Sequence, residues 1–398
     1  MLQLSVVNFK KGAYVVIEGT NDADKFFIIQ QGQVRCTLNN QHPGYKQTTL
    51  GPGDFVGVVP CMAGRHQIES AIALTDVSCI SVRKEQYQEL IKTNTPVAIK
   101  IIRTFASKVR SLNDTLSQVT ANNTAASSDE QLFTTAAYYE TKGQLNLAVY
   151  GYYQYLKASP KGMYAAVAQK RFVALKPMAK SVCFEPSADL LRTYPKGTMV
   201  FSDSQKGADM FVIKDGKVRI SKVVNGKEVI FAILNKGDMF GEMALLENKP
   251  RSASAIAEEN CTLMTINRRN FDQMVATQPQ LIDSLTTMLA ERIWTMYRQL
   301  SNSAMTNPVD RMIDMLSLQV EKNRAVAYSH TPLQTDLQPY NLAVMCGIDV
   351  RMQPDLLEKF IRFAHVKFEQ ARILVPDCME LVKQAEYLRK PKRGVTIV

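Results

Sequence analysis

A carboxylate and a guanidinium stand nine positions apart in the stretch FGEMALLENKPRSASA, residues 240–255. Glu242 can accept a proton from a hydroxyl group, and Arg251 offers a planar fork that suits two oxygens of a phosphate. Ser252 adds a hydroxyl donor, and the small residues after it leave room in a tight pocket. A sugar ring fused to a cyclic phosphate carries both a free 2′-hydroxyl and one negative charge. The spacing therefore predicts a site for a ligand of this chemistry.

The residues next to Glu242 position it. The run GEMALL predicts a short helix that begins at Glu242, so that free N–H groups and the helix dipole face an anion. A carboxylate beside an anionic ligand is useful only if it accepts a hydroxyl proton. Glu242 is therefore assigned to the sugar and Arg251 to the phosphate.

This stretch resembles the phosphate-binding cassette of the cyclic-nucleotide-binding domain family, which has Phe-Gly-Glu, an apolar pair, a short gap and Pro-Arg-Ser/Thr/Ala-Ala. The upstream run KGTMVFSDSQKGADMFVIKDGKVRI also fits that family. The resemblance implies that Glu242 binds the ribose 2′-hydroxyl and that Arg251 binds the cyclic phosphate. The ligand-binding set that it implies is Gly241, Glu242, Met243, Ala244, Arg251, Ser252 and Ala253.

The base of such a ligand is expected to meet the helix that follows this domain. The candidates for contact with the base are Arg292, Trp294, Met296 and Tyr297. An aromatic cap on a purine is one role for Trp294, and a place in the core is the other. We expect cAMP in preference to cGMP as the regulatory ligand, while cGMP and a cyclic dinucleotide stay open.

The elements that must carry this cassette occur twice in the chain. Residues 9–38 and 194–222 both run from an aromatic residue and Lys-Gly through alternating apolar residues to a Gly turn and Val-Arg, and LGPGDF at 50–55 echoes LNKGDM at 234–239. The period is near 184 residues, which suits two copies of one domain rather than a solenoid. Short alternating runs broken by turn residues predict antiparallel strands, and each copy is expected to be a jelly-roll-like β-roll.

The first copy departs from the cassette at its decisive positions. Val58 stands where the second copy has Glu242, Gln67 stands where it has Arg251, and Glu69 adds a negative charge. Arg65 and His66 could restore anion binding only through a shifted loop. We interpret the first copy as a structural or dimerising domain without a ligand.

Each copy ends in a helix with a heptad-like apolar seam. The seam residues are Ala98, Ile102, Phe105, Val109, Leu112 and Leu116 in the first helix and Ile282, Leu285, Leu289, Ile293, Met296 and Leu300 in the second. A seam this regular usually meets another helix. It predicts either a homodimer or an intramolecular pairing of the two copies, a pseudo-dimer.

Between the copies, a polar linker is followed by a helical pattern from 132 to 160. The spacing of Ala136, Tyr139, Gly143, Ala148, Tyr152 and Pro160 resembles one tetratricopeptide repeat. One repeat and a half is too little to stand alone. A helical spacer and a groove that binds a protein partner therefore remain equal alternatives.

The C-terminal residues 305–398 resemble the winged-helix output domain of the Crp/Fnr regulators. The runs LQPYNLAVMCGI and LLEKFIRFAHV resemble the two helices of a helix-turn-helix. A recognition helix should present donors to base edges, whereas Pro354 and the acidic residues Asp355 and Glu358 oppose this role. The DNA-contact candidates are Arg351, Gln353, Lys359 and Arg362.

Composition excludes several other classes. The net charge of +11 is spread over the chain, which permits binding to nucleic acid without arguing for it. The seven cysteines form no CxxC pair and the four histidines are dispersed, so we expect reduced thiols, no metal site and no catalytic residues. No apolar run reaches the length of a membrane span and no signal peptide is recognised, so the expected location is cytoplasmic, without membrane contact.

These observations predict an α+β multidomain protein and not an enzyme. It would contain two cyclic-nucleotide-binding β-roll domains, an α-helical hairpin insert and a C-terminal winged helix-turn-helix. The expected boundaries are 1–118 for the degenerate copy, 119–131 for the linker, 132–178 for the insert, 179–303 for the competent copy and 304–398 for the winged helix. The predicted function is a Crp/Fnr-like regulator whose second domain controls transcription through double-stranded DNA. The alternatives are an adaptor that acts through protein contacts and a scaffold without ligand.

Overall fold

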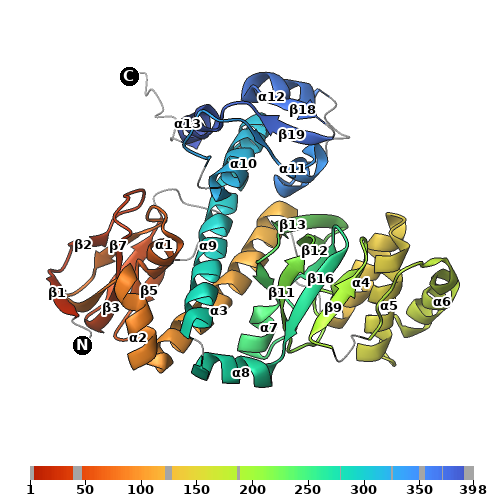
Figure 1. Cartoon of the computed structure of the whole chain (residues 1–398), viewed down its shortest axis with the longest axis horizontal. Coiled ribbons are helices and arrows are strands. Elements are labelled where there is room, and N and C mark those ends of the chain that lie inside the picture. Colours follow the sequence, from red (N-terminus) through yellow and green to blue (C-terminus); the bar gives the residue numbers. More distant parts are fainter. Residues whose placement is uncertain are drawn as a thin grey trace. The chain divides into compact units, whose positions relative to one another are not determined.

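The computed structural model describes residues 4–38, 47–121, 128–185, 189–277, 279–323, 326–348, 355–369 and 371–389 (Figure 1). Its contacts divide the chain into two units. The first contains Met1–Gln118 and Asn122–Met296, and the second contains Val119–Ala121 and Tyr297–Val398. Each unit is described by itself below.

The N-terminal part of the first unit is a roll of two antiparallel four-stranded sheets. The strand orders are β1-β8-β3-β6 and β2-β7-β4-β5. The strands are β1 Ser5–Phe9, β2 Tyr14–Val16, β3 Lys25–Gln31, β4 Val34–Thr37, β5 Thr48–Leu50, β6 Phe55–Val56, β7 Ser70–Ala73 and β8 Val77–Arg83. Their inward-facing residues, such as Ile29, Val34 and Cys79, form one apolar core. The helices of this part are α1 Val58–Ala63, the 3₁₀ turn η1 Lys84–Gln86, α2 Tyr87–Thr93 and α3 Thr95–Ala121.

The second roll repeats this topology strand for strand. Its sheets have the orders β10-β15-β12-β13 and β14-β11-β16-β9, which correspond to those of the first roll. The strands are β9 Leu191–Tyr194, β10 Met199–Phe201, β11 Met210–Asp215, β12 Val218–Val224, β13 Lys227–Leu234, β14 Met239–Phe240, β15 Ser254–Ala257 and β16 Cys261–Ile266. The helices are α7 Glu242–Glu247, α8 Arg268–Thr277 and α9 Pro279–Ser303. The equal strand orders confirm the duplication that the sequence predicts.

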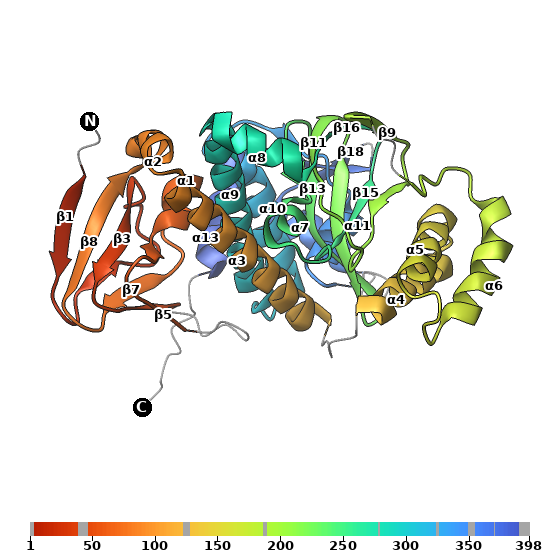
Figure 2. The same cartoon turned by 90° about the horizontal axis from the view of Figure 1, so that it is seen from below.

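The two long helices bury the seams expected of them. All six seam residues of α3 and all six of α9 are buried. Because these seams are enclosed within a single chain, their burial in this structure needs no second copy. Figures 1 and 2 both show α3 and α9 between the two rolls.

Three helices follow one another in the sequence between the two rolls, a helical hairpin and the further helix after it. They are α4 Ser128–Thr141, α5 Leu145–Ala158 and α6 Ala165–Leu175, followed by the 3₁₀ turn η2 Lys176–Met178. Within the predicted linker 119–131, α3 continues to Ala121 and α4 begins at Ser128, while residues 122–127 lie outside the described residues. The linker stays a prediction for that segment.

These insert helices share a core with the second roll. Tyr139, Ala148 and Tyr152 pack in one cluster with Met199, Val223 and Ile256. Tyr139 also donates to Glu228 at 3.0 Å, and Gln131 donates to the carbonyl of Val223 at 2.6 Å. The insert is therefore part of the second roll's packing.

The second unit begins with the last residues of α9. It contains α10 Pro308–Lys322, α11 Pro339–Met345, α12 Leu356–Ala364 and α13 Cys378–Arg389, with a small sheet of order β17-β19-β18. Its strands are β17 Leu333–Gln334, β18 Lys367–Glu369 and β19 Arg372–Val375. Pro308 occupies the first turn of α10, where Asn307 caps the helix by accepting from the Val309 amide at 2.9 Å.

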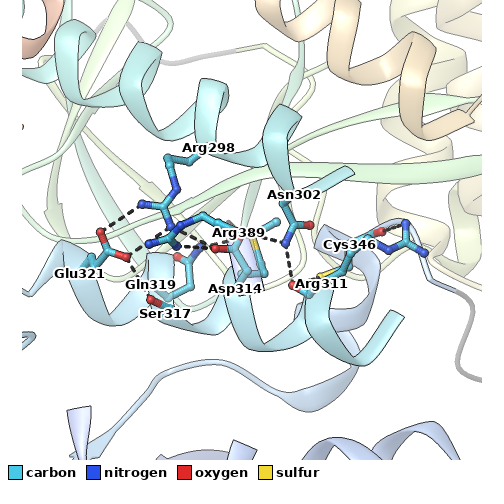
Figure 3. A network of polar contacts seen from close by, with 10 residues as sticks. Arg298, Asn302, Arg311, Asp314, Ser317, Gln319, Glu321, Cys346 and Arg389 are labelled. Atoms are coloured by element: carbon cyan, nitrogen blue, oxygen red, sulfur yellow. Dashed lines mark hydrogen bonds and ion pairs between the residues drawn. The ribbon is translucent and has the colours of Figure 1, made fainter. Parts of the chain in front are cut away.

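A buried polar network joins α9, α10 and α13 in this unit (Figure 3). Asp314 accepts from Arg298 at 3.1 Å, from Arg389 at 2.6 Å and from Asn302 at 3.0 Å. Glu321 accepts from Arg298 at 3.2 Å. Since removal of one partner would leave an uncompensated buried charge, this network fixes the end of α9 firmly on α10.

Candidate functional site

The predicted cassette is a turn, a short helix and a loop on the edge of the second roll. β14 ends at Phe240, Gly241 turns the chain with φ 81°, and α7 begins at Glu242. The positive φ favours glycine, and a Cβ at Gly241 would approach the Arg251 side chain to 2.8 Å. Glycine therefore permits both the turn and the close approach of Arg251.

Glu242 is buried and already engaged. Its side chain is 1% exposed, and Oε1 accepts from Nη1 of Arg292, on α9, at 2.7 Å. Arg292 also donates to the carbonyl of Met239 at 2.9 Å. The second carboxylate oxygen, Oε2, is buried without a hydrogen-bond partner in the described structure. An unsatisfied buried acceptor is costly, so a hydroxyl donor would be favourable at this atom.

Arg251 lies inside the roll as a buried cation. Its Nη1 donates to the carbonyls of Asp209 at 2.7 Å and Gly241 at 2.8 Å, and the guanidinium lies 4.1 Å from the ring centroid of Phe201. Burial lowers the pKa of Arg251 to about 10, so it stays charged at neutral pH. Both hydrogen-bond partners are neutral carbonyls, and Nε has no partner in the described structure. The arrangement suits an incoming anion.

The other predicted cassette residues line the same turn and loop. Met243, Ala244, Ser252 and Ala253 are all buried, with Ser252 9% exposed. The structure thus brings the whole predicted set together between β14 and β15.

Helix α3, which belongs to the first copy, also reaches this cassette. Arg110 pairs with Glu247 and donates to the carbonyl of Pro250 at 3.0 Å. Asn113 is 4% exposed, and its Nδ2 lies 3.5 Å from Oγ of Ser252. The sequence did not single out Arg110 and Asn113, although a shift of 184 positions aligns them with Trp294 and Tyr297, two of the base-contact candidates.

The mirror contact joins α9 to the first cassette. Trp294 donates from Nε1 to the carbonyl of His66 at 3.2 Å, and Arg65 lies over its ring at 5.0 Å. Arg110 and Trp294 are 184 positions apart, and so are His66 and Pro250. Each long helix therefore donates to the same carbonyl of the opposite cassette, which is a pseudo-twofold relation within one chain.

Two of the base-contact candidates have partners in this structure. Arg292 donates to Glu242, the carboxylate predicted to bind the sugar, and Trp294 packs against the first copy through its ring and its N–H. Trp294 is thus a packing residue between the copies. Met296 and Tyr297 are buried on α9 and remain candidates.

The first copy keeps the shape of the cassette without its charges. Gly57 turns with φ 72° before α1, and Val58 occupies the first position of that helix. Gln67 is 1% exposed and donates to the carbonyl of Asp22 at 2.7 Å. A neutral amide therefore fills the arginine position.

The DNA-contact candidates are placed only in part. Lys359 and Arg362 are exposed on α12. Arg351 and Gln353 lie outside the described residues. No group of residues that could hold a metal ion is found in the part of the chain that the structure describes. No helix among the described residues is long and apolar enough to cross a membrane.

Comparison with known families agrees with this geometry. Residues 6–94 and 191–278 each match the model of the cyclic nucleotide-binding domain. Both rolls are thus domains of this class, and together the matched segments make up less than half of the chain.

Several curated proteins are similar over part of the chain. The cyclic AMP receptor protein of Thermus thermophilus is 32% identical over 35% of this chain and 58% of its own length. The CRP-like cAMP-activated global transcriptional regulator of Mycobacterium tuberculosis is 23% identical over 48% of this chain and 86% of its own length. The human cGMP-dependent protein kinase 2 is 28% identical over 35% of this chain and 19% of its own length. The chain thus spans little more than half of the Thermus receptor.

Solved structures with related folds also cover about half of the chain. The CooA mutant of Carboxydothermus hydrogenoformans is 19% identical, with a TM-score of 0.42, over 49% of this chain and 87% of that one. The regulator CLP of Xanthomonas campestris is 20% identical, with a TM-score of 0.40, over 46% of this chain and 92% of that one. Scores in this range add nothing to the sequence matches.

Proposed function

We propose that this protein is a Crp/Fnr-like regulator that binds a cyclic nucleotide, cAMP in preference to cGMP, in its second domain. The observation that carries the proposal is the pair of buried ionic side chains in one cassette. The Arg251 guanidinium donates to two neutral carbonyls, and Glu242 has one buried oxygen without a hydrogen-bond partner among the described residues. Two relatives are described as cAMP-responsive regulators, which supports cAMP as the ligand.

The proposed switch is a competition for Glu242. A ribose 2′-hydroxyl that donates to this carboxylate would alter its ion pair with Arg292, which lies on α9. Since α9 is one continuous helix from Pro279 to Ser303, a displacement of Arg292 would also displace the rest of this helix. The ligand shifts the equilibrium only by its differential affinity for the two states, typically about 1–3 kcal/mol.

The first domain takes the place of a second subunit in this proposal. It holds no ligand and provides α3, which contacts the second cassette through Arg110 and Asn113. The reciprocal contact of Trp294 with His66 supports an intramolecular pseudo-dimer rather than an obligate homodimer. Analytical ultracentrifugation tests the oligomeric state, and a monomer is expected. That monomer should bind the nucleotide with full affinity.

The output is assigned to residues 304–398 as a winged-helix-like domain that binds double-stranded DNA. Lys359 and Arg362, exposed on α12, are the described candidates for phosphate contact. The alternative is an adaptor that contacts a protein through the tetratricopeptide-like insert. An electrophoretic shift with random duplex at low and high salt separates them, because phosphate contacts weaken steeply with salt.

The only tryptophan of the chain provides a direct test of the switch. Trp294 lies two residues from Arg292, so ligand binding at Glu242 is expected to change its emission. Fluorescence titration of the full chain with cAMP and with cGMP measures this. A saturable change supports the proposal. No change with either nucleotide, together with an unchanged melting temperature, supports a scaffold without ligand.

A further inference from the structure

One loop connects the helical insert to the phosphate-binding arginine. Residues 202–209 lie between β10 and β11 and run past Arg251. The Ser204 amide donates to the carbonyl of Arg251 at 2.8 Å, and the Arg251 amide donates to the carbonyl of Gln205 at 2.9 Å. These two backbone bonds hold the main chain of Arg251 against the loop.

Gln205 fixes the conformation of this loop. Its Oε1 accepts from the amide of Ser202 at 2.9 Å, and its own amide donates to the carbonyl of Ser202 at 3.2 Å. Ser204, between them, adopts φ 65°, which is uncommon for a residue with a side chain. A turn in this conformation persists only where its surroundings hold it.

The insert provides that support through Tyr150 of α5. The ring is 3% exposed, and Oη donates to Oε1 of Gln205 at 3.1 Å. A weaker bond of 3.4 Å joins Oη to the carbonyl of Val200. Tyr150 thus contacts the one side-chain oxygen that closes the Ser202 turn.

The insert is rigidly seated at this place. Tyr150 belongs to a buried cluster that combines α4, α5 and α6 with Met199, Val223 and Ile256 of the second roll. A close-packed cluster transmits displacement rather than absorbing it.

The first copy offers a natural contrast. Its equivalent backbone bonds persist, since the Gly19 amide donates to the carbonyl of Gln67 at 2.8 Å and the Gln67 amide donates to the carbonyl of Thr20 at 2.9 Å. Gln67, in the arginine position, donates to the carbonyl of Asp22 in its own loop, while its Oε1 is buried without a hydrogen-bond partner among the described residues. The described helices of the insert share their core cluster with the second roll, the copy that keeps the arginine.

We propose that Tyr150 is a positioning residue for Arg251, and that the helical insert thereby sets the affinity of the second domain for the phosphate of a cyclic nucleotide. This inference rests on the proposed function. By linkage, a protein bound to the insert would change nucleotide affinity, and the nucleotide would change the affinity for that protein by the same factor.

The test uses the full chain and four nucleotides that separate the contribution of the phosphate to binding from that of the sugar. Calorimetric titration is carried out with cAMP, with its phosphorothioate diastereomers and with 2′-deoxy-cAMP. Loss of one neutral hydrogen bond in Tyr150→Phe is expected to weaken cAMP binding about fivefold. The preference between the two phosphorothioates should shrink, because Arg251 is less well placed. The ratio of cAMP to 2′-deoxy-cAMP affinity should stay constant, because Glu242 is untouched.

Tyr152→Phe is the matched control. Tyr152 is equally buried on the same helix, but its hydroxyl donates to Glu140 inside the insert at 2.6 Å. This variant should lose at least as much stability as Tyr150→Phe, because its lost hydrogen bond is to a carboxylate, and should keep every nucleotide affinity. Gln205→Ala should reproduce the effect of Tyr150→Phe, and the double variant should be no weaker than Gln205→Ala alone.

Two negative outcomes are distinct. If the wild-type chain binds none of the probes, the proposed function fails and this inference with it. If the wild type binds cAMP while Tyr150→Phe and Tyr152→Phe behave alike, or if both ligand ratios shift together, the positioning role is overturned and the proposed function stands.

Discussion

The two cassettes of this chain share a backbone and differ in what they bury. Each turns at a glycine with positive φ, starts a short helix and returns through a loop held by the same pair of backbone hydrogen bonds. The second encloses Glu242 and Arg251, whereas the first encloses Val58 and Gln67. Only the second therefore contains buried charge that a ligand could satisfy.

This difference shows that strand order, turns and backbone bonding are enough to keep the domain folded. Buried ionic groups cost free energy unless they are paired, so they are informative wherever they persist. The first copy has lost them and kept its contacts with α9. We therefore propose that the first copy serves in packing, through contacts such as that of Trp294 with His66.

The largest effect is expected from breaking the contact between the copies. Trp294→Ala removes the largest fully buried side chain and its bond to His66, and should cost about 3–5 kcal/mol of unfolding free energy. Arg110→Ala, its mirror on α3, should cost about 1 kcal/mol because that side chain is partly exposed. Urea unfolding measures both. Equal costs would contradict the assignment of Trp294 to the core.

The next effect concerns the arginine position. Arg251→Ala should weaken cAMP binding at least about 100-fold, because a charge-assisted contact to the phosphate is lost. Gln67→Ala, at the equivalent position of the first copy, should leave the affinity unchanged. Calorimetric titration measures the cAMP affinity of both variants, and circular dichroism checks that both are folded. Sensitivity to Gln67 would mean that the first copy also binds.

A smaller effect separates the sugar from the phosphate. Glu242→Gln should weaken cAMP about 10-fold and leave 2′-deoxy-cAMP nearly unchanged, since the lost partner is the 2′-hydroxyl. Val58→Ala, at the equivalent position of the first copy, should keep the wild-type ratio of cAMP to 2′-deoxy-cAMP affinity. If Glu242→Gln lost the same affinity for both ligands, Glu242 would not be the residue that binds the 2′-hydroxyl.

The last prediction concerns how many cysteine thiols react in the folded chain. Six of the seven cysteines are buried, and burial raises the pKa of Cys61 to about 12 and that of Cys79 to about 11. The thiolate forms only as pH rises through the pKa, so these groups stay protonated at pH 8. Cys183, half-buried with a raised pKa, is the most accessible. A chromogenic disulfide reagent should modify about one thiol in the folded chain and all seven after denaturation.

The sequence alone predicts the duplication, the cassette and the seams, because each depends on residue types at fixed spacings within short segments. Glycine turns, alternating strands and the pair Glu242 and Arg251 all lie within short windows. The structure adds what spacing cannot carry. The contact of Arg110 with Pro250 spans 140 positions, and that of Trp294 with His66 spans 228.

Two further differences have physical causes. Arg292, which the sequence predicts at the base, pairs with Glu242 in this structure, because a buried carboxylate favours the nearest cation, and its contact with the base stays a prediction. Polar residues at 119–131 were expected to be a linker, yet both ends are helical, since polar composition also suits the solvent face of a helix. Tyr150 shows no local pattern that would connect it with Arg251.

The most direct test of the account is the stoichiometry of cAMP on the full-length chain. Calorimetry should give one site per chain for the wild type and none for Arg251→Ala. Two sites per chain, or one site that survives Arg251→Ala, would contradict the central claim that only the second cassette binds the nucleotide.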